Sequence, residues 1–208
     1  MSDEDVPSPI DFHELAQARE WEAQTTIKRP WRPQFFAAFA AALNSRFDRE
    51  FSILELGSGP GHLAEQILRD CKVAKYGALD FSKAMHELAH ARLGAFLDKI
   101  DFLQRDFRST DWPTGLKNFD AVVTMQAAHE LRHKRRLPAL LSQVQTCLSR
   151  GGLFLYCDHY AESADAERQN LFLSQADQPA ALREANFTDV RTLLDVGGMA
   201  LLSATNPG

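Results

Sequence analysis

The 208-residue sequence has few cysteines, no excess of positive charge and no long apolar run. Its three cysteines, Cys71, Cys147 and Cys157, are too scattered for a disulfide framework or a CxxC metal site, which favours a reducing cytoplasm. The formal net charge of −5 disfavours nucleic acid and anionic membranes as main partners, because both attract positive surfaces. No apolar run approaches the roughly 18 residues of a membrane span, and no basic, apolar leader precedes residue 10. We therefore expect a cytoplasmic protein without a metal site that acts on neither membranes nor nucleic acid.

Composition and chain breaks predict one main domain with an N-terminal appendage. The chain is 45% hydrophobic and 25% charged, which is close to average globular usage and sufficient for a core. Residues 1–9 are acidic and contain prolines, so we expect a disordered tail. Residues 10–32 show a helical pattern from Asp11 and end at the break RPWRP, and we expect a helical lid there. Residues 33–208 form the predicted main domain.

From residue 51 onward, apolar strand patterns alternate with helical patterns. The predicted strands span 51–56, 74–80, 100–106, 119–125 and 150–158, and the predicted helices span 35–47, 62–70, 83–97, 134–148 and 179–187. Strands separated by helices predict right-handed crossovers and a parallel sheet with helices on both faces. The last two strand patterns flank only Asp195 to Gly198, which is too short for a crossover, so they form an antiparallel hairpin. The predicted fold class is α/β: a three-layer α/β/α sandwich whose mostly parallel seven-stranded sheet is closed by an antiparallel C-terminal hairpin.

Three glycines alternate in the run ILELGSGPG (53–61), directly after the first strand. A glycine loop between a strand and a helix N-terminus is typical of a site for an anionic or polar ligand, because unpaired N–H groups point into it. No Gly-Lys-Ser/Thr follows, which excludes a Walker loop, and His62 stands where a dinucleotide fingerprint has its last glycine. Asp80 ends the second strand 21 residues after Gly59, where its carboxylate can accept hydrogen bonds from ribose hydroxyls.

These motifs, taken in order, resemble the class I S-adenosylmethionine-dependent methyltransferases over residues 33 to 205. ILELGSGPG is similar to the first motif of the family, and YGALDFSKAM, FLQRDF, FDAVVTMQAAHEL and SRGGLFLYCDHY are similar to later ones. The resemblance implies a Rossmann-like domain that binds S-adenosyl-L-methionine and releases S-adenosyl-L-homocysteine. It implies the following cofactor-binding residues: Glu55, Gly57, Ser58, Gly59, Gly61, Asp80, Phe81, Met85, Asp106, Phe107 and Gln126.

The resemblance also implies a role for several members of this set. Asp80 would hold the ribose, Phe81 and Met85 would pack on the adenine, and Asp106 would accept from the adenine amino group beside Phe107.

The methionine end of the cofactor needs partners for its ammonium and carboxylate groups. Glu55 is expected to hold the glycine loop and to receive the ammonium group. Arg29 or Arg32 could bind the carboxylate, because a guanidinium matches a carboxylate in a bidentate pair. The alternative for both arginines is a solvated turn.

The residues that follow the fourth and fifth strands are the candidates for chemistry. Placement does most of the work in an in-line methyl transfer, so a general base is needed only for a protonated acceptor. His129 and His159 are the candidate catalytic residues, because the pKa of imidazole is about 6.5 and the group can therefore accept a proton near neutral pH. The alternative for each histidine is that it only lines the pocket.

The segment MQAAHEL after the fourth strand lacks the Asn/Asp-Pro-Pro-Tyr/Phe of methyltransferases that modify nucleic-acid bases. This difference favours a small-molecule acceptor that is methylated on O, N, S or C. The basic residues 132–136 are interpreted as a solvated loop. We expect residues 11–32, with Phe12, His13, Trp21 and Trp31, to cover the substrate as a lid.

Two rival interpretations remain at this point. One is a non-catalytic domain of the same fold that binds S-adenosylmethionine or S-adenosylhomocysteine or acts as a scaffold. The other is a nicotinamide dehydrogenase, which His62 and the antiparallel hairpin disfavour.

Overall fold

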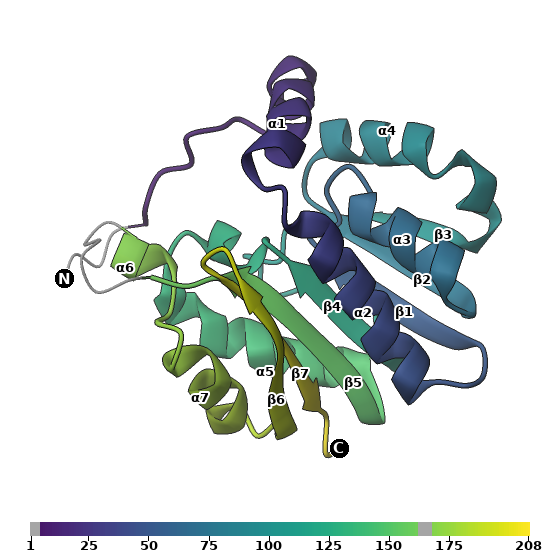
Figure 1. Cartoon of the computed structure of the whole chain (residues 1–208), viewed down its shortest axis with the longest axis vertical. Coiled ribbons are helices and arrows are strands. Elements are labelled where there is room, and N and C mark those ends of the chain that lie inside the picture. Colours follow the sequence, from purple (N-terminus) through teal and green to yellow (C-terminus); the bar gives the residue numbers. More distant parts are fainter. Residues whose placement is uncertain (1–4, 162–167) are drawn as a thin grey trace.

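A seven-stranded sheet forms the middle layer of the molecule (Figure 1). The structure, a computed structural model, describes residues 5–161 and 168–208. The strands are β1 (Phe51–Leu56), β2 (Val73–Asp80), β3 (Ile100–Gln104), β4 (Phe119–Met125), β5 (Leu148–His159), β6 (Thr188–Val196) and β7 (Met199–Thr205). Their order across the sheet is β3-β2-β1-β4-β5-β7-β6, and only β7 runs antiparallel to its neighbours. The predicted fold class is confirmed.

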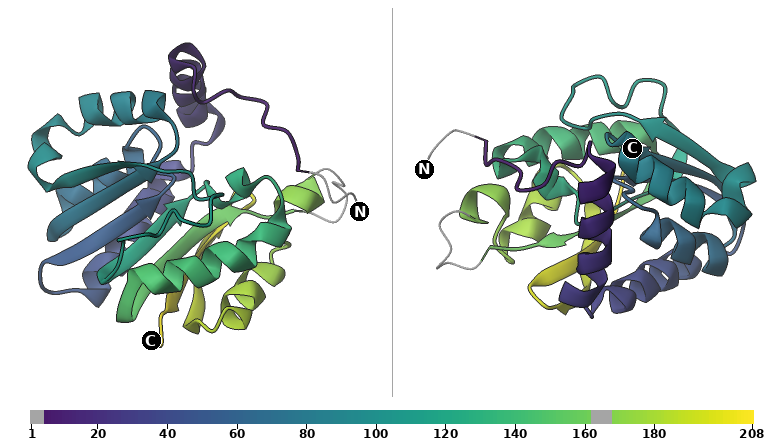
Figure 2. Two further views of the ribbon diagram at one scale, coloured as in Figure 1. Left: turned by 180° about the vertical axis from the view of Figure 1, so that it is seen from behind. Right: turned by 90° about the horizontal axis from the view of Figure 1, so that it is seen from above.

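Helices cover both faces of this sheet. The helices are α1 (Leu15–Lys28), α2 (Arg32–Arg46), α3 (His62–Asp70), α4 (Lys83–Arg92), α5 (Leu137–Cys147), α6 (Arg168–Leu171) and α7 (Asp177–Glu184), with short 3-10 segments η1 (Gly94–Lys99), η2 (Ala128–Leu131) and η3 (Lys134–Arg136). Helices α2, α3 and α4 lie on one face, and α5 and α7 lie on the other (Figures 1 and 2). Helix α1 lies outside these layers, above the edge where the parallel strands end. No helix in the described ranges is long and apolar enough to cross a membrane.

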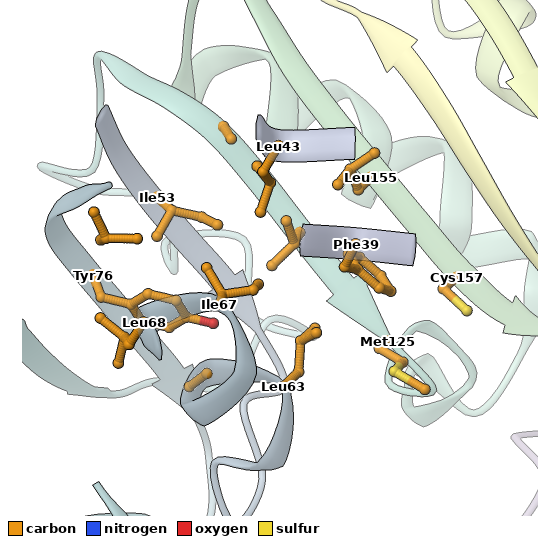
Figure 3. Packing of buried hydrophobic residues seen from close by; sticks show 14 of the residues in the cluster. Phe39, Leu43, Ile53, Leu63, Ile67, Leu68, Tyr76, Met125, Leu155 and Cys157 are labelled. Carbon is orange, nitrogen blue, oxygen red and sulfur yellow. The ribbon is translucent and has the colours of Figure 1, made fainter. Parts of the chain in front are cut away.

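The larger helices dock through apolar stripes that the sequence spacing already contains. On α2, Phe39 and Leu43 are fully buried and point toward Ile53 of β1 and Leu155 of β5 (Figure 3). Burying one such side chain stabilises the fold by about 1.5–3 kcal/mol. A second core fills the other face, between α5, α7 and the opposite side chains of the same strands. Both faces of the parallel strands are therefore buried, which explains their nearly continuous apolar sequence.

Two helix starts show how local chemistry sets the boundaries. Helix α4 begins after Ser82, whose hydroxyl accepts the N–H of Met85 at 3.0 Å, as predicted. Helix α1 begins at Leu15, four residues later than expected. The reason is that the Asp11 carboxylate accepts the N–H of His13 at 2.9 Å, which closes a local turn in place of a helical cap.

Residues 5–13, here called the strap, run from the region beside α6 across to α1 (Figure 2). Arg132 fixes one end, because its guanidinium donates to the carbonyl of Val6 at 2.7 Å and to that of Pro7 at 2.6 Å. Its own carbonyl accepts the N–H of Val6 at 2.9 Å. Ser82 donates its hydroxyl to the carbonyl of Phe12 at the other end. Part of the segment expected to be a disordered tail is thus held against the domain, while residues 1–4 lie outside the described residues.

Candidate active site

The glycine loop is tied to the end of the neighbouring strand. The N–H groups of Gly57 and Ser58 both donate to the carbonyl of Leu79, at 2.8 and 3.0 Å. The N–H of Gly59 donates to the Asp80 carboxylate at 2.8 Å. The loop after β1 therefore takes its shape from the last two residues of β2.

The three loop glycines are needed for different reasons. Gly57, Gly59 and Gly61 have φ angles of +68°, +52° and +82°, in the left-handed region that favours glycine. A Cβ on Gly57 would lie 2.2 Å from the Cβ of Ala127, and one on Gly61 would lie 3.0 Å from Leu93. A Cβ on Gly59 would meet nothing within 4 Å. Protein packing accounts for the first and third glycines, and of the three only Gly59 would direct a Cβ into open space that a ligand can occupy.

Asp80 has the geometry expected of a ribose-binding carboxylate. One oxygen accepts the N–H of Gly59, and the other accepts that of Ser82 at 2.9 Å. A carboxylate has about four acceptor positions, so sites remain for two hydroxyl donors. Burial raises the pKa of Asp80 to about 6, against the opposing effect of these backbone hydrogen bonds.

Glu55 does not hold the loop, in contrast to the expectation. Its carboxyl accepts the hydroxyl of Tyr76 at 2.6 Å beneath the loop, while Leu79 and Asp80 hold the loop backbone. Burial raises the pKa of Glu55 to about 8, even though the hydrogen bond from Tyr76 acts in the other direction. The group is therefore largely protonated at neutral pH, and its role toward an ammonium group stays a prediction.

A pocket of about 610 Å³, including its open mouth, lies at the ends of the parallel strands. The pocket is lined by Phe12, Trp21, Arg29, Gly57, Gly59, Asp80, Phe81, Met85, Phe107, Gln126, Ala127, His129 and Glu130. Nine of these come from the predicted site residues, so the structure brings most of that set together.

Other predicted site residues lie around this pocket and do not line it. Ser58 and Gly61 shape the loop, and His159 lies behind Gln126. Asp106 lines a neighbouring hollow together with residues of the strap. Its Oδ2 accepts hydrogen bonds from Nε of Arg108 at 2.9 Å and from Nη2 at 2.7 Å. These contacts outweigh the effect of burial, and the pKa of Asp106 lies below its ordinary value.

The two candidate arginines differ in their surroundings. Arg29 lines the pocket. Arg32 stacks over the ring of Phe36 at 5.3 Å, and its Nε has no hydrogen-bond partner among the described residues. Burial, and then the charge of Arg29, lowers the pKa of Arg32 to about 10. A guanidinium with this environment is suited to an incoming anion.

Two further buried polar atoms near the pocket have no hydrogen-bond partner in the described part of the chain: Ser58 Oγ and Gln126 Oε1. Buried polar groups in native proteins are usually hydrogen-bonded, so a cluster of unmatched ones indicates a missing polar ligand. The open side of Gly59 and the unmatched atoms around it fit a molecule with both donors and acceptors.

A second group of side chains occupies the ends of β4 and β5. Gln126 adopts φ +55°, a left-handed conformation that is uncommon for a residue other than glycine. Its Nε2 lies 2.8 Å from Nε2 of His159. The ring of His129 contacts the Asp158 carboxylate, with Nδ1 at 2.8 Å from Oδ1. The rings of both histidines lie against Phe172.

The sequence interpretation missed two members of this region and one pairing. Asp158 was recognised as a residue at the end of the fifth strand, but its pairing with His129 was not predicted. Arg132 was interpreted as solvated, which is wrong, because only 6% of it is exposed and it binds the strap. Phe172 follows α6 and carries no motif that would indicate its place beside the histidines.

Comparison with known proteins agrees with this geometry. A family model described as a methyltransferase domain matches residues 53–152. An O-methyltransferase family protein from Burkholderia thailandensis superposes with a TM-score of 0.75 at 15% identity, over 93% of this chain and 61% of that chain. A methyltransferase in complex with the Haloferax volcanii activator Trm112 superposes with a TM-score of 0.69 at 18% identity, over 97% of this chain and 100% of that chain. The DhpI–SAH complex superposes with a TM-score of 0.67 at 21% identity, over 92% of this chain and 94% of that chain. No curated protein sequence matches this chain.

Residues 53–152 match a methyltransferase domain, and the chain has the Rossmann-like fold of methyltransferases that use S-adenosylmethionine as cofactor. The pocket fits the cofactor by its own chemistry, because Gly59 leaves an open approach, Asp80 retains acceptor positions, and unmatched polar atoms surround the loop. When bound, the cofactor supplies an electrophilic methyl group. Across residues 5–161 and 168–208, no cluster of His, Cys, Asp and Glu side chains has the arrangement of a metal site.

Proposed function

We propose that the chain transfers the methyl group of S-adenosylmethionine to a small organic molecule that enters beside His129. One observation carries the proposal: the glycine loop with Asp80, and His129 on the β4–β5 side, line a single pocket. The cofactor groups and the acceptor can therefore meet without a large rearrangement. We place the reaction in the cytoplasm, a reducing compartment that suits three free cysteines.

Within this proposal, the cofactor lies along the ends of β1, β2 and β3. Asp80 accepts from the ribose hydroxyls, and Phe81 and Met85 give the adenine an apolar wall. Phe107 lies across the pocket from these residues on the loop after β3. Asp106 must rotate away from Arg108 or share it before it can accept from the adenine amino group, because its oxygens already bind that guanidinium.

Arg29 and Arg32 are the proposed partners of the methionine carboxylate. Arg29 lines the pocket directly, and Arg32 has an unmatched Nε a short distance along the chain. Desolvation strengthens a charge pair of this kind once the ligand excludes water. We assign the larger share to Arg29 because it faces the pocket.

The strap and α1 are the proposed lid over the acceptor. Phe12 and Trp21 line the pocket and pack edge to face, with ring centroids 5.5 Å apart. Phe12 also meets the ring of Phe81 at 6.4 Å, so the lid and the predicted adenine wall share one aromatic cluster. An acceptor with an apolar, planar portion suits this lining better than a bulky polar polymer.

Calorimetry and methyl transfer test the function together. The full chain is expected to bind S-adenosylmethionine and S-adenosylhomocysteine, and to move a labelled methyl group from the former into the small-molecule fraction of a cell extract. Label found instead in nucleic acid or protein would overturn the small-molecule acceptor. The matched control is Asp101→Asn, which changes an exposed carboxylate paired with Lys75 on the far edge of the sheet.

A further inference from the structure

His129 and Asp158 form a buried pair that the cofactor-binding residues do not explain. The Asp158 side chain is 2% exposed and that of His129 is 18% exposed. One carboxylate oxygen of Asp158 accepts from ring Nδ1 at 2.8 Å, and the other accepts the backbone N–H of the same histidine at 2.9 Å. The N–H of His159 adds a further donor to Asp158 at 2.8 Å. Three donors thus hold one buried carboxylate in a single orientation.

This arrangement determines which ring nitrogen is available. Because the carboxylate accepts at Nδ1, that nitrogen carries the proton and Nε2 of His129 has the free lone pair. His129 lines the pocket, whereas Asp158 does not. The pair therefore presents a proton acceptor toward the space where we place the methyl acceptor.

The charged groups around the ring favour its protonated form. Burial by itself would lower the pKa of His129, but Asp158, its hydrogen bond and Glu130 raise it above the ordinary value, and Arg132 offsets only part of this effect. Glu130 has an oxygen 3.5 Å from Nε2, and Arg132 holds the other oxygen of that carboxylate at 3.1 Å. Lys134 lines a small cavity behind the pair, on the Asp158 side. A proton taken up at Nε2 would therefore be stabilised by two carboxylates.

His159 is less suited to this role. Its Nε2 is 2.8 Å from the Gln126 amide, so that nitrogen is already in a hydrogen bond. Its ring centroid is 6.3 Å from that of His129, and it does not line the pocket. Of the two predicted catalytic histidines, the geometry favours His129.

We propose that Asp158 is a positioning residue that holds His129 as a general base, and that the acceptor is methylated on a hydroxyl oxygen. The inference rests on the proposed function, which it deepens by naming the acceptor class. His129 Nε2 takes the hydroxyl proton as the oxygen forms its bond to the methyl carbon. The carbon–sulfur bond breaks with its electron pair going to sulfur, so the positive charge lost there equals the one gained by the imidazole.

A hydroxyl is the acceptor that gains most from such a base. A phenol, with a pKa of about 10, is hardly ionised at neutral pH, whereas a thiol at about 8.5 ionises far more readily. A neutral amine already offers a lone pair and can lose its proton after the methyl group has arrived. General-base catalysis contributes about 10²–10⁴-fold where the proton must leave during the step. A buried, oriented base is therefore expected for a hydroxyl acceptor and is superfluous for an amine.

The first test needs no substrate. Nitrogen-15 NMR of the histidines in the free protein is expected to show His129 with its neutral form protonated at Nδ1 and with a pKa above the ordinary value. The Asp158→Asn variant removes the charge and should lower that pKa, while Asp101→Asn should leave it unchanged. A neutral His129 protonated at Nε2, or a pKa that Asp158→Asn does not move, would overturn the positioning role. Thermal unfolding of the variant distinguishes a lost interaction from a lost fold.

The second test follows the chemistry. With methyl-labelled S-adenosylmethionine and the small-molecule extract, the carbon-13 shift of the product is expected to identify an O-methyl group. Asp158→Asn and His129→Ala should each lower the rate by about 10²–10⁴-fold and leave the cofactor Kd within about twofold. The double variant should be no slower than His129→Ala, because the two residues act as one unit.

The outcomes of these tests distinguish the hydroxyl-acceptor proposal from the methyltransferase function on which it rests. An N-, S- or C-methyl product, or full activity in Asp158→Asn, would overturn the hydroxyl assignment and leave the methyltransferase intact. A protein that binds the cofactor and transfers no label to any extract component would overturn the proposed transfer, and the NMR result would then stand alone. Asp158→Glu keeps the carboxylate on a longer side chain. If this variant restores the native pH dependence of the methyl-transfer rate, the result would support positioning by charge.

Discussion

The two halves of the pocket are built in different ways. On the β1–β2 side, the loop of residues 57–61 offers its backbone, and a single carboxylate, Asp80, ties it to the next strand. On the β4–β5 side, the surface consists of side chains from two segments: Gln126 and His129 follow β4, and Asp158 lies at the end of β5. The backbone part of the first half is one continuous loop, whereas the second half consists of side chains that the fold brings together. Cofactor recognition can therefore be similar in proteins that share little sequence, while the acceptor half changes with individual side chains.

The contrast extends to charge. Burial raises the pKa of Asp80 to about 6, and no cationic side chain of the described residues pairs with this carboxylate. In the other half, His129 outweighs the effect of burial on Asp158 and holds its pKa below the ordinary value. The Asp80 carboxylate can thus take a ligand as its partner, whereas the His129–Asp158 pair of the acceptor half is already satisfied internally.

Substitutions of the loop glycines are expected to have the largest effects, and they test the roles assigned to the first half of the pocket. Gly57→Ala combines a left-handed φ with a Cβ 2.2 Å from Ala127, so we expect a loss of about 2–5 kcal/mol of unfolding free energy in urea denaturation. Gly59→Ala has the same kind of strain and open space, so it should lose only about 1–2 kcal/mol. It should nevertheless bind S-adenosylhomocysteine far more weakly in calorimetry. Equal losses of stability in the two variants would contradict the separate roles assigned to these glycines.

Removing the Asp80 charge should weaken the cofactor without touching the acceptor half. Hydrogen bonds to a charged group are worth about 1.5–3 kcal/mol, so Asp80→Asn is expected to raise the Kd for S-adenosylhomocysteine by about 10- to 100-fold. The His129 titration should stay as in the native protein. A change in that titration would show that the two halves are coupled.

The raised pKa of Asp80 makes cofactor binding depend on pH. Only the ionised carboxylate can accept from two ribose hydroxyls while it holds the N–H groups of Gly59 and Ser82, so the affinity should fall as the pH drops through about 6. The free protein should show the opposite sign, since a folded-state pKa above the unfolded one adds stability below about pH 4 that is lost by about pH 6. Calorimetry of native protein and Asp80→Asn between these values measures both effects. An Asp80→Asn variant that keeps the full pH dependence would assign it to another group.

The smallest effect is expected at the strap. Arg132→Met keeps the apolar stem and removes the donors to Val6 and Pro7, so residues 5–13 should be cut several-fold faster by a protease. Bound S-adenosylhomocysteine should slow the cleavage in the native protein if the strap and α1 form a lid. The control is Arg150→Met, which changes an exposed arginine that lies beside Gly208. Equal cleavage with and without ligand would argue against the lid.

The local features of the sequence were enough for much of the fold. The apolar strands, the Ser82 cap and the hairpin before β7 each follow from spacing and residue type, and the structure confirms them, although the turn consists of Gly197 and Gly198 and not of the four expected residues. The start of α1 was misplaced because the Asp11 side chain closes a turn that competes with the cap. Such competition depends on differences of about 1 kcal/mol, which a pattern does not resolve.

By itself, the sequence determined the order of strands and helices, the glycine loop and the acid that ends β2, because these depend on neighbours along the chain. The tertiary structure decided that Glu55 pairs with Tyr76, that Arg132 holds the strap, and that Asp158 faces His129. Those contacts join residues 21, 126 and 29 positions apart, and their geometry exists only once the sheet has brought the strand ends together. The pKa values were likewise decided by the tertiary structure, because burial and the neighbouring groups in the fold set each of them.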